Sequence, residues 1–294
     1  MVHYRHSYHA GNFADVFKHV LLIGLLAALN RKDKPWCYLE THAGAGDYDL
    51  GGEGATRTGE WQDGIGRLTD PSGAPELVAE YLRLMMVARD QAGAQHYPGS
   101  PQFARALARP QDRLVLCEKV PAVAEDLKRS LRGDGRVAIH LRDGYEAHAL
   151  LPPAEKRGLM LIDPPFERGD EFDAIAGLIA KSAARFAGGV YAAWYPVKNR
   201  HVVSQFARRV ARETGRPVLR LEFDTGAGAQ TVSTVRAGTG RGEAKVIEKH
   251  PLHACGLLVV NPPYGFEQQA DAALRWLAQR LAQGAGAGFT AESY

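Results

Sequence analysis

The chain has 294 residues, of which 45% are hydrophobic, and a formal net charge of +3 at pH 7. This length suits one large domain or a domain with an insertion, and the lack of an unbroken run of 18 apolar residues argues against a membrane span. The first residues lack the apolar core of a secretory signal. The three cysteines stand far apart, so neither a disulfide framework nor a zinc knuckle is expected. We therefore expect a cytoplasmic protein without a metal site.

Strand-like runs alternate with helical patterns along much of the chain. The predicted strands are 35–41, 112–119, 136–144, 157–165 and 188–196, and the predicted helices between and after them are 120–133, 173–188 and 201–215. Such alternation is typical of βαβ units and of a parallel sheet covered on both faces. The sequence therefore predicts a doubly wound α/β fold.

The connection after the first predicted strand is too long for a simple crossover, which needs only about a dozen residues. It runs from Thr41 to Asp112. Ser100-Pro101 is typical of a helix start, with serine as the N-cap and proline at the first helical position. Residues 51–96 are then surplus, and their helical patterns predict a small inserted helical subdomain within a single domain of residues 1–294. We expect the Gly/Ala-rich tail, 282–294, to be mobile.

Two glycines, Gly44 and Gly46, follow the first predicted strand. Such a loop lets the backbone come close to a nucleotide ligand, and the lack of a GxxxxGK[ST] pattern argues against ATP hydrolysis. Dinucleotide-binding folds place a ribose-binding acid about 20 residues beyond the glycines. Glu118 lies 72 residues beyond Gly46, and leaving out the 46 residues of the insertion reduces this to 26.

Polar residues lie at or just beyond the ends of four predicted strands. They are Glu40, His42, Glu118, Asp143 (followed by Gly144) and Asp163. Open α/β sheets bind ligands at the carboxyl ends of their strands, so these residues predict a nucleotide-type site. Each of them alone could also be an ordinary polar residue at a strand end.

The fourth predicted strand ends in Asp163-Pro164-Pro165-Phe166. An exocyclic adenine amino group is a poor nucleophile because its lone pair is delocalised into the ring. The Asp163 carboxylate and the neighbouring backbone carbonyl can accept the two hydrogens of this amino group. This favours a tetrahedral nitrogen whose lone pair points at a methyl group, and Asp163 can also take the proton that the nitrogen loses after methyl transfer. Pro164 keeps the carbonyls rigid and offers no competing N–H, while Phe166 gives an extruded base a ring to stack on. A plain strand-terminating turn is the alternative.

A second copy of this pattern, Asn261-Pro262-Pro263-Tyr264, lies on a later strand. In a methyltransferase sheet the last strand runs antiparallel, so its carboxyl end faces away from the ligand edge. We expect this copy to be a structural exit into the following helix.

Six segments of the chain together resemble the RlmJ family. They are YRHSYHAGNFADVFKH (4–19), YLETHAGAGDY (38–48), YPGSP (97–101), LIDPPF (161–166), AAWYPV (192–197) and VVNPPY (259–264). The resemblance implies a Rossmann-like class I methyltransferase fold that uses S-adenosylmethionine. It also implies N6-methylation of one adenine of 23S rRNA, adenine 2030, as protein-free RNA or an early assembly intermediate, by a monomer.

The resemblance further implies individual roles. Contact with the cofactor, or catalysis, is implied for Lys18, His19, His42, Ser100, Glu118, Asp143, Gly144 and Asp163, and contact with the RNA for Tyr4 and His6. Phe166 stands where many relatives have tyrosine, and Glu40 where aspartate is common.

Other interpretations stay open from the residues alone. The N-terminal histidines could suggest a metal site, but no regular ligand spacing completes it. The basic residues between 208 and 249 could form a phosphate-binding face or an ordinary solvated surface. A DNA adenine methyltransferase, a non-catalytic RNA-binding protein and an NAD-dependent dehydrogenase are the alternative functions, although the dehydrogenase leaves the DPPF segment without a purpose.

Overall fold

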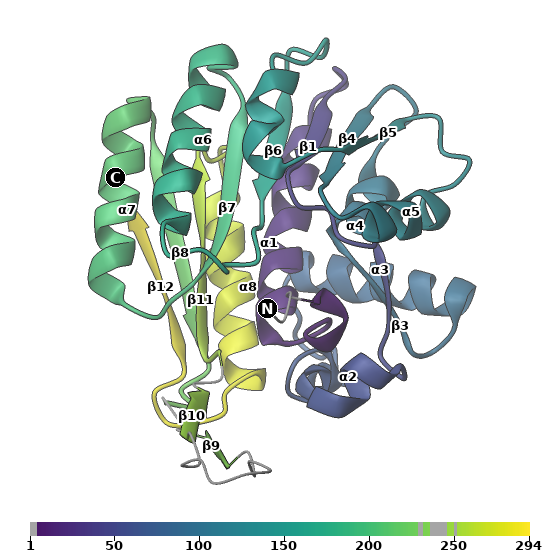
Figure 1. Ribbon diagram of the computed structural model, residues 1–294, viewed down its shortest axis with the longest axis vertical. Coiled ribbons are helices and arrows are strands. Elements are labelled where there is room, and N and C mark those ends of the chain that lie inside the picture. The colour runs from purple at the N-terminus through teal and green to yellow at the C-terminus, as the bar shows by residue number, and fades with distance from the viewer. Residues whose placement is uncertain (1–4, 229–231, 236–245, 250–251) are drawn as a thin grey trace, which may run out of the picture.

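An eight-stranded sheet forms the centre of the computed structural model, which describes residues 5–228, 232–235, 246–249 and 252–294 (Figure 1). In spatial order the strands are β12 (Gly288–Ser293), β8 (Val218–Asp224), β11 (Ala254–Val260), β7 (Val190–Pro196), β6 (Gly158–Ile162), β1 (Cys37–Glu40), β4 (Arg113–Glu118) and β5 (Val137–Leu141). The five strands from β7 to β5 are parallel, and β11 and β12 run antiparallel to their neighbours. The predicted doubly wound α/β fold is confirmed, with β6 beside β1.

Alternation along the strands divides the interior into two cores. Tyr38 of β1 contributes to one core and its neighbours Cys37 and Leu39 to the other, because successive side chains of a strand point to opposite faces. The main helices of the first core are α1 (Phe13–Asn30), α3 (Glu76–Ala92), α4 (Ser100–Leu107), α5 (Pro121–Ser130) and α8 (Phe266–Arg280), and those of the second are α6 (Glu171–Arg185) and α7 (Arg200–Thr214).

Helix α1 lies at the centre of the first core and was not predicted from the sequence. Its N-cap is Asn12, whose side chain accepts a hydrogen bond from the Asp15 backbone N–H at 3.0 Å. By length and composition the helix could cross a membrane, but 89% of its 18 residues are buried within the protein. Because the helix is apolar on nearly all sides, it lacks the amphipathic period by which surface helices are recognised.

The surplus residues 51–96 contain α2 (Glu53–Thr58), two 3₁₀ turns, η2 (Glu60–Asp63) and η3 (Ile65–Arg67), and α3. The short strands β2 (Asp47–Asp49) and β3 (His96–Pro98) pair antiparallel on either side of them. Leu77 and Tyr81 of α3 are buried in the same core as α1. That these residues form a subdomain of their own stays a prediction.

Two local predictions are wrong. The tail is not free: its last residues form β12, and backbone hydrogen bonds join Val218 and Tyr294 in both directions. Ser100 is not a side-chain N-cap, because Gly99 occupies the capping position and the Ser100 hydroxyl donates to Glu40 instead. Glycines favour a flexible loop locally, but the residues that follow them in the tail pair with β8 as an edge strand.

The segment Asn261-Pro262-Pro263 lies at the edge of the sheet opposite the carboxyl ends of the parallel strands, as predicted. Val260 of β11 pairs with Tyr191 near the start of β7, and the Asn261 side-chain amide donates to the carbonyls of Ala187 and Gly189. This segment therefore ends a strand and does not contribute to the site below.

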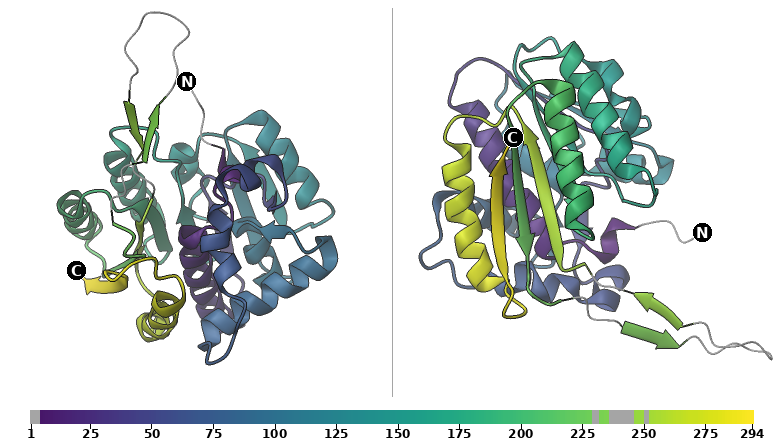
Figure 2. Two further views of the ribbon diagram at one scale, coloured as in Figure 1. Left: turned by 90° about the horizontal axis from the view of Figure 1, so that it is seen from below. Right: turned by 90° about the vertical axis from the view of Figure 1, so that its left-hand side faces the viewer.

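Ion pairs hold Arg209 and Arg220, two of the basic residues between 208 and 249 that the structure describes. Arg220 is buried in β8 and pairs with Glu292, and Arg209 on α7 pairs with Asp173 and Glu213. Arg236, Arg241 and Lys245 lie outside the described residues. In this stretch the structure shows an antiparallel hairpin of β9 (Val232–Val235) and β10 (Val246–Lys249), which projects from the body after β8 (Figure 2).

Candidate active site at the carboxyl edge of the sheet

The ends of β1, β4 and β5 meet closely at one edge of the sheet. The Gly44 N–H donates to Oε2 of Glu118 at 3.0 Å, which joins the loop after β1 to the end of β4. A Cβ on Gly144 would lie 2.2 Å from the Thr41 carbonyl oxygen and 2.7 Å from Cε1 of His42. The structure thus brings the predicted residues of three strand ends together, and only glycine fits at position 144.

The backbone conformation of the loop after β1 requires glycine at positions 44 and 46. Gly44 and Gly46 have φ values of 65° and 81°, and a Cβ on Gly44 would lie 2.4 Å from the Tyr48 hydroxyl. Residues with side chains rarely adopt this left-handed backbone. The loop therefore keeps bare backbone at the edge where open α/β sheets hold their ligands.

Two carboxylates stand on the rim of this loop. Glu118 accepts from the Gly44 and Val120 N–H groups, at 3.0 and 2.8 Å. Asp143 accepts from the Tyr145 N–H at 3.1 Å and pairs with the exposed Lys119 at 2.7 Å. Both side chains are thereby fixed at the ends of β4 and β5, where ribose and base groups of a nucleotide would need acceptors.

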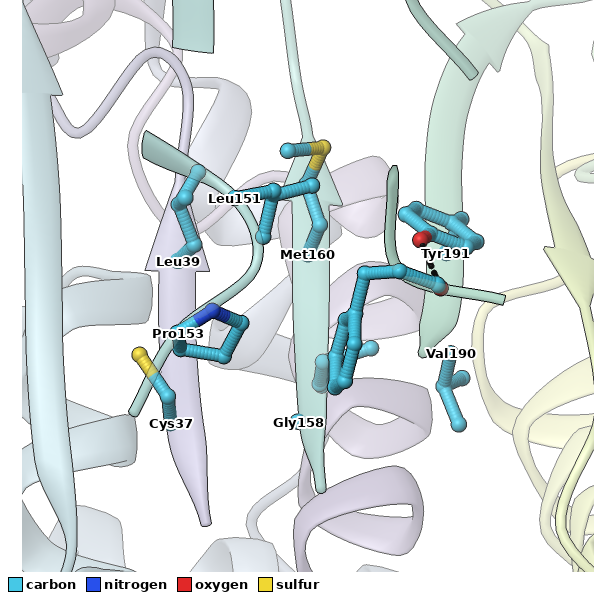
Figure 3. Close-up of a pocket in the computed structure, with 10 residues that line it drawn as sticks. Cys37, Leu39, Leu151, Pro153, Gly158, Met160, Val190 and Tyr191 are labelled. Carbon is cyan, nitrogen blue, oxygen red and sulfur yellow. Dashed lines mark hydrogen bonds between the residues drawn. The ribbon is translucent and has the colours of Figure 1, made fainter. Parts of the chain in front are cut away.

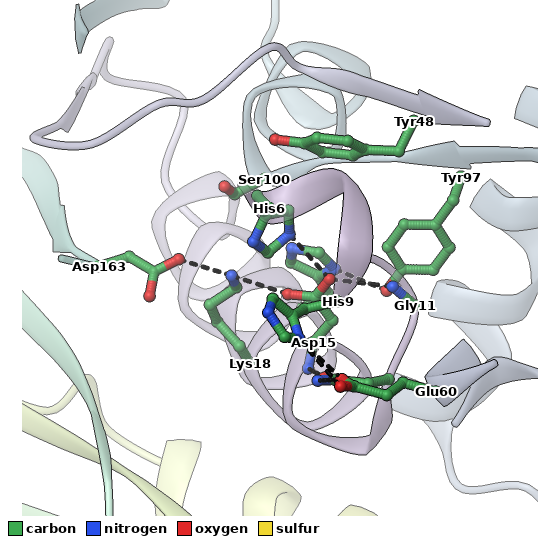
Figure 4. Close-up of polar contacts among 12 residues, drawn as sticks. His6, His9, Gly11, Asp15, Lys18, Tyr48, Glu60, Tyr97, Ser100 and Asp163 are labelled. Carbon is green, nitrogen blue, oxygen red and sulfur yellow. Dashed lines mark hydrogen bonds and ion pairs between the residues drawn. The ribbon is translucent and has the colours of Figure 1, made fainter. Parts of the chain in front are cut away.

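Asp163 is held by a lysine from α1, as Figure 4 shows. Nζ of Lys18 lies 2.6 Å from Oδ2 of Asp163 and 2.9 Å from Oδ1 of Asp15. Burial alone would lower the pKa of Lys18, but the charges of Asp15 and Asp163 outweigh it and raise this pKa well above its usual value. Lys18 is therefore an ammonium group, and it orients one oxygen of Asp163. Within the described residues Oδ1 of Asp163 accepts no hydrogen bond.

The ion pair continues outward to the N-terminal segment. Oδ2 of Asp15 lies 3.0 Å from Nε2 of His6 and accepts from the Gly11 N–H at 3.0 Å. Burial would raise the pKa of Asp15, but His6 and Lys18 together hold it well below its usual range. The His6 ring lies 4.8 Å from the ring of Tyr48 beside the glycine loop. His6 is thus at the site, whereas Tyr4 lies outside the described residues.

Asp15 was not among the residues predicted for the site. The spacing of Asp15 and Lys18 could have indicated it, because residues three apart on a helix share a face and can form an ion pair.

His19 and His42 occupy different surroundings. His19 is buried on α1, where Nδ1 lies 2.9 Å from the Tyr97 hydroxyl and Nε2 has no partner among the described residues. Burial and the nearby Lys18 lower its pKa well below the usual value. His42 lies at the strand edge with Nδ1 2.7 Å from Oγ1 of Thr41, and burial lowers its pKa to about 4. Both rings are therefore neutral at physiological pH.

Glu40 is a buried carboxyl group at the end of β1. The Ser100 hydroxyl donates to its Oε1, and Oε2 has no partner among the described residues. Burial raises the pKa of Glu40 to about 8, against the effect of the Ser100 hydrogen bond. Glu40 is consequently largely protonated at neutral pH and carries no full charge into the site.

Phe166 ends the Asp-Pro-Pro turn in a left-handed conformation, with φ at 51°. Its half-buried ring meets Phe172 and Trp194 edge-on, with centroids 5.3 and 6.0 Å away. Pro164 is buried beside it. A positive φ costs a residue with a side chain about 1–3 kcal/mol and is found preferentially at functional sites.

A separate apolar cavity lies at the other end of the strands (Figure 3). Cys37, Gly158 and Val190, which line it, are the first residues of β1, β6 and β7. It is therefore far along the sheet from Asp163 and the glycine loop. No group of three His, Cys, Asp or Glu side chains suited to a metal ion occurs in the described part of the chain.

The chain is similar to known proteins along nearly its whole length. The family model described as "Ribosomal RNA large subunit methyltransferase D, RlmJ" matches residues 33–234. The chain is 38% identical to the ribosomal RNA large subunit methyltransferase J of Escherichia coli (strain K12), over 100% of this chain and 99% of that protein. It is 36% identical to the protein of the same name from Haemophilus influenzae, over 96% and 94%. A crystal structure of a Legionella pneumophila protein superposes with a TM-score of 0.79 at 34% identity, over 97% and 98% of the two chains.

Proposed function

The chain belongs to the RlmJ family of large-subunit ribosomal RNA methyltransferases, and on this premise we propose that it methylates N6 of a specific adenine in 23S rRNA. The methyl donor is S-adenosylmethionine. The target that the resemblance implies is adenine 2030. The proposal rests chiefly on one observation: the carboxylate of Asp163 is held by Lys18 at the end of β6, directly beside β1 and its glycine loop.

The chain has residues that fit this methyl donor. Gly44 and Gly46 expose a left-handed backbone on which a Cβ would meet the hydroxyl groups of Tyr48 and Ser130, and the carboxylates of Glu118 and Asp143 stand at the next two strand ends. We assign nucleoside binding to these four residues, with His42 and Gly144 closing the same edge. We also propose that Ser100, Lys18 and the buried His19 contact the cofactor. Bound there, S-adenosylmethionine supplies an activated methyl group on sulfur.

The residues of the turn after β6 prepare the target nitrogen. Oδ1 of Asp163 and a backbone carbonyl of the Asp-Pro-Pro turn accept the two amino hydrogens of an extruded adenine. This directs the nitrogen lone pair outward, and Asp163 takes the proton that N6 loses on methylation. Pro164 has no N–H to compete for these acceptors, and Phe166 stacks on the base. Lys18 keeps the carboxylate in position, so alignment contributes much of the rate.

We place the reaction in the cytoplasm, on protein-free 23S rRNA or an early assembly intermediate, and expect the enzyme to act as a monomer without a metal ion. His6 and Tyr4 contact the RNA in this proposal.

The substrate is tested by methyl transfer from labelled S-adenosylmethionine to protein-free 23S rRNA, intact large subunits and duplex DNA. Label in the free RNA alone supports the proposal. Label in DNA would favour a DNA adenine methyltransferase, and RNA binding without any label would favour a non-catalytic protein.

A further inference from the structure

We propose that Glu60, which belongs to the inserted residues 51–96, is a positioning residue for methyl transfer. It holds the turn of residues 9–12 that precedes α1, and through this turn it sets the Asp15–Lys18–Asp163 ion network. The inference rests on the proposed function and gives the insertion a purpose in it.

Glu60 binds the N-terminal turn at two places (Figure 4). Both of its carboxylate oxygens lie 3.0 Å from Nδ1 of His9, and Oε2 accepts from the side-chain amide of Asn12 at 3.0 Å. One acidic side chain from the insertion thus clamps both ends of the turn.

The backbone next to Glu60 reinforces this clamp. The Ile65 N–H donates to the Gly11 carbonyl at 2.9 Å. Gly64 lies so close to the turn that a Cβ there would be 2.1 Å from the same carbonyl oxygen. The turn is therefore fitted against residues 60–65 along its length and does not merely touch them through one charged pair.

Hydrogen bonds connect this turn to the Asp15–Lys18–Asp163 ion network. Asn12 donates to Glu60 through its Nδ2 and, through its Oδ1, accepts from the Asp15 N–H as the cap of α1. The Gly11 N–H donates to Oδ2 of Asp15, and Oδ1 of Asp15 holds Lys18. A shift of the turn would move the Asp15 carboxylate, and with it the ammonium group that orients Asp163.

The path from Glu60 through the turn to Lys18 is exposed at its outer end and buried at its inner end, so its outer end can be mutated without disturbing the core. The side chains of Glu60 and His9 are 37% and 36% exposed, whereas those of Asp15 and Lys18 are 4% and 5% exposed. Truncation of Glu60 therefore loosens the outer end of the path without opening a cavity in the core. Asp63, on the same 3₁₀ turn, is 57% exposed and pairs only with Arg67 among the ion pairs of the described residues, which makes it a matched control.

The experiment compares Glu60→Ala, Glu60→Gln and Asp63→Ala in single-turnover methyl transfer to protein-free 23S rRNA at saturating cofactor. Misplacement of a catalytic group by about 1 Å can cost up to about 100-fold, and we expect Glu60→Ala to slow transfer roughly 10-fold. Glu60→Gln should keep most of the rate, because its amide oxygen still accepts from Asn12. Asp63→Ala should match the wild type. The cofactor Kd should change less than about twofold in all three.

A double-mutant cycle separates positioning from general damage to the fold. In a Lys18→Met background, Glu60→Ala should slow transfer by less than about twofold further, because the group it acts through is gone. The same 10-fold loss in both backgrounds, or a Glu60→Ala rate equal to that of Asp63→Ala, would overturn the proposal.

Amide hydrogen exchange gives a readout that does not depend on activity. The Gly11 and Asp15 amides should exchange faster in Glu60→Ala than in the wild type. In Asp63→Ala their exchange rates should equal those of the wild type. If the wild type methylated no RNA, the proposed function would fail, and unchanged exchange in Glu60→Ala would separately show that Glu60 does not hold the network.

Discussion

Nζ of Lys18 lies 2.6 Å from Oδ2 of Asp163, which joins the first helix to a strand end 145 residues later in the chain. The Asp163 carboxylate is therefore not supported by its own strand alone. Contacts link it through Lys18 and Asp15 to α1, to the turn before α1 and to Glu60.

Asp15 should stabilise the fold, because Lys18 and His6 hold the pKa of its carboxyl group well below the usual range. We expect Asp15→Asn to lower the free energy of unfolding by about 3 kcal/mol at pH 7, the usual cost of breaking a buried ion pair. This contribution is complete above the unfolded-state pKa of 3.8 and is lost as pH falls through the lower folded-state pKa. Urea unfolding should give a constant difference between the two proteins from pH 7 down to about 4 and a shrinking difference from there to about pH 2. A difference that stays constant down to about pH 2 would contradict the assignment.

Glu40 should have the opposite effect on stability. Between its unfolded-state pKa of 4.5 and its folded-state pKa of about 8, the folded protein keeps a proton that the unfolded chain has released. The free energy of unfolding should therefore fall with rising pH across this window, by at most about 1.4 kcal/mol per pH unit from this group. Glu40→Gln, unfolded in urea without cofactor from pH 5 to 9, should lose this slope. Parallel curves for the two proteins would show that Glu40 ionises normally.

Gly44→Ala should weaken cofactor binding by about 10-fold or more, because the new Cβ would lie 2.4 Å from the Tyr48 hydroxyl on a backbone with a φ of 65°. Gly177→Ala on α6 is the matched control, since a Cβ there meets nothing within 4 Å. Calorimetric titration with S-adenosylmethionine measures both. Equal Kd values for the two variants would remove the glycine loop from the cofactor site.

Phe166→Tyr should stay active, whereas Phe166→Ala should lose roughly 5- to 150-fold in transfer, the equivalent of about 1–3 kcal/mol of base stacking. The ring already packs edge-on against Phe172 and Trp194, so unfolding temperatures must be measured beside the rates. Equal rates for all three proteins would exclude a stacking role.

The sequence predicted the parallel strands and the edge where the candidate site lies, because strand ends that carry Glu118, Asp143 and Asp163 are local signals. It did not predict α1, since a helix that is apolar on nearly all sides has no amphipathic period. The Lys18–Asp163 pair is a contact between distant segments, and only the resemblance drew attention to Lys18. The final strand was missed because its pairing with β8 is decided by tertiary packing, whereas the preceding glycines are a strong local signal for a loop.

The most direct test is methyl transfer to protein-free 23S rRNA by the wild type and by Asp163→Ala, followed by digestion and identification of the modified nucleoside. We expect N6-methyladenosine with the wild type and no transfer with the variant, while calorimetry should show that the variant still binds S-adenosylmethionine. A different methylated nucleoside, or substantial turnover by Asp163→Ala, would contradict the role given to this carboxylate.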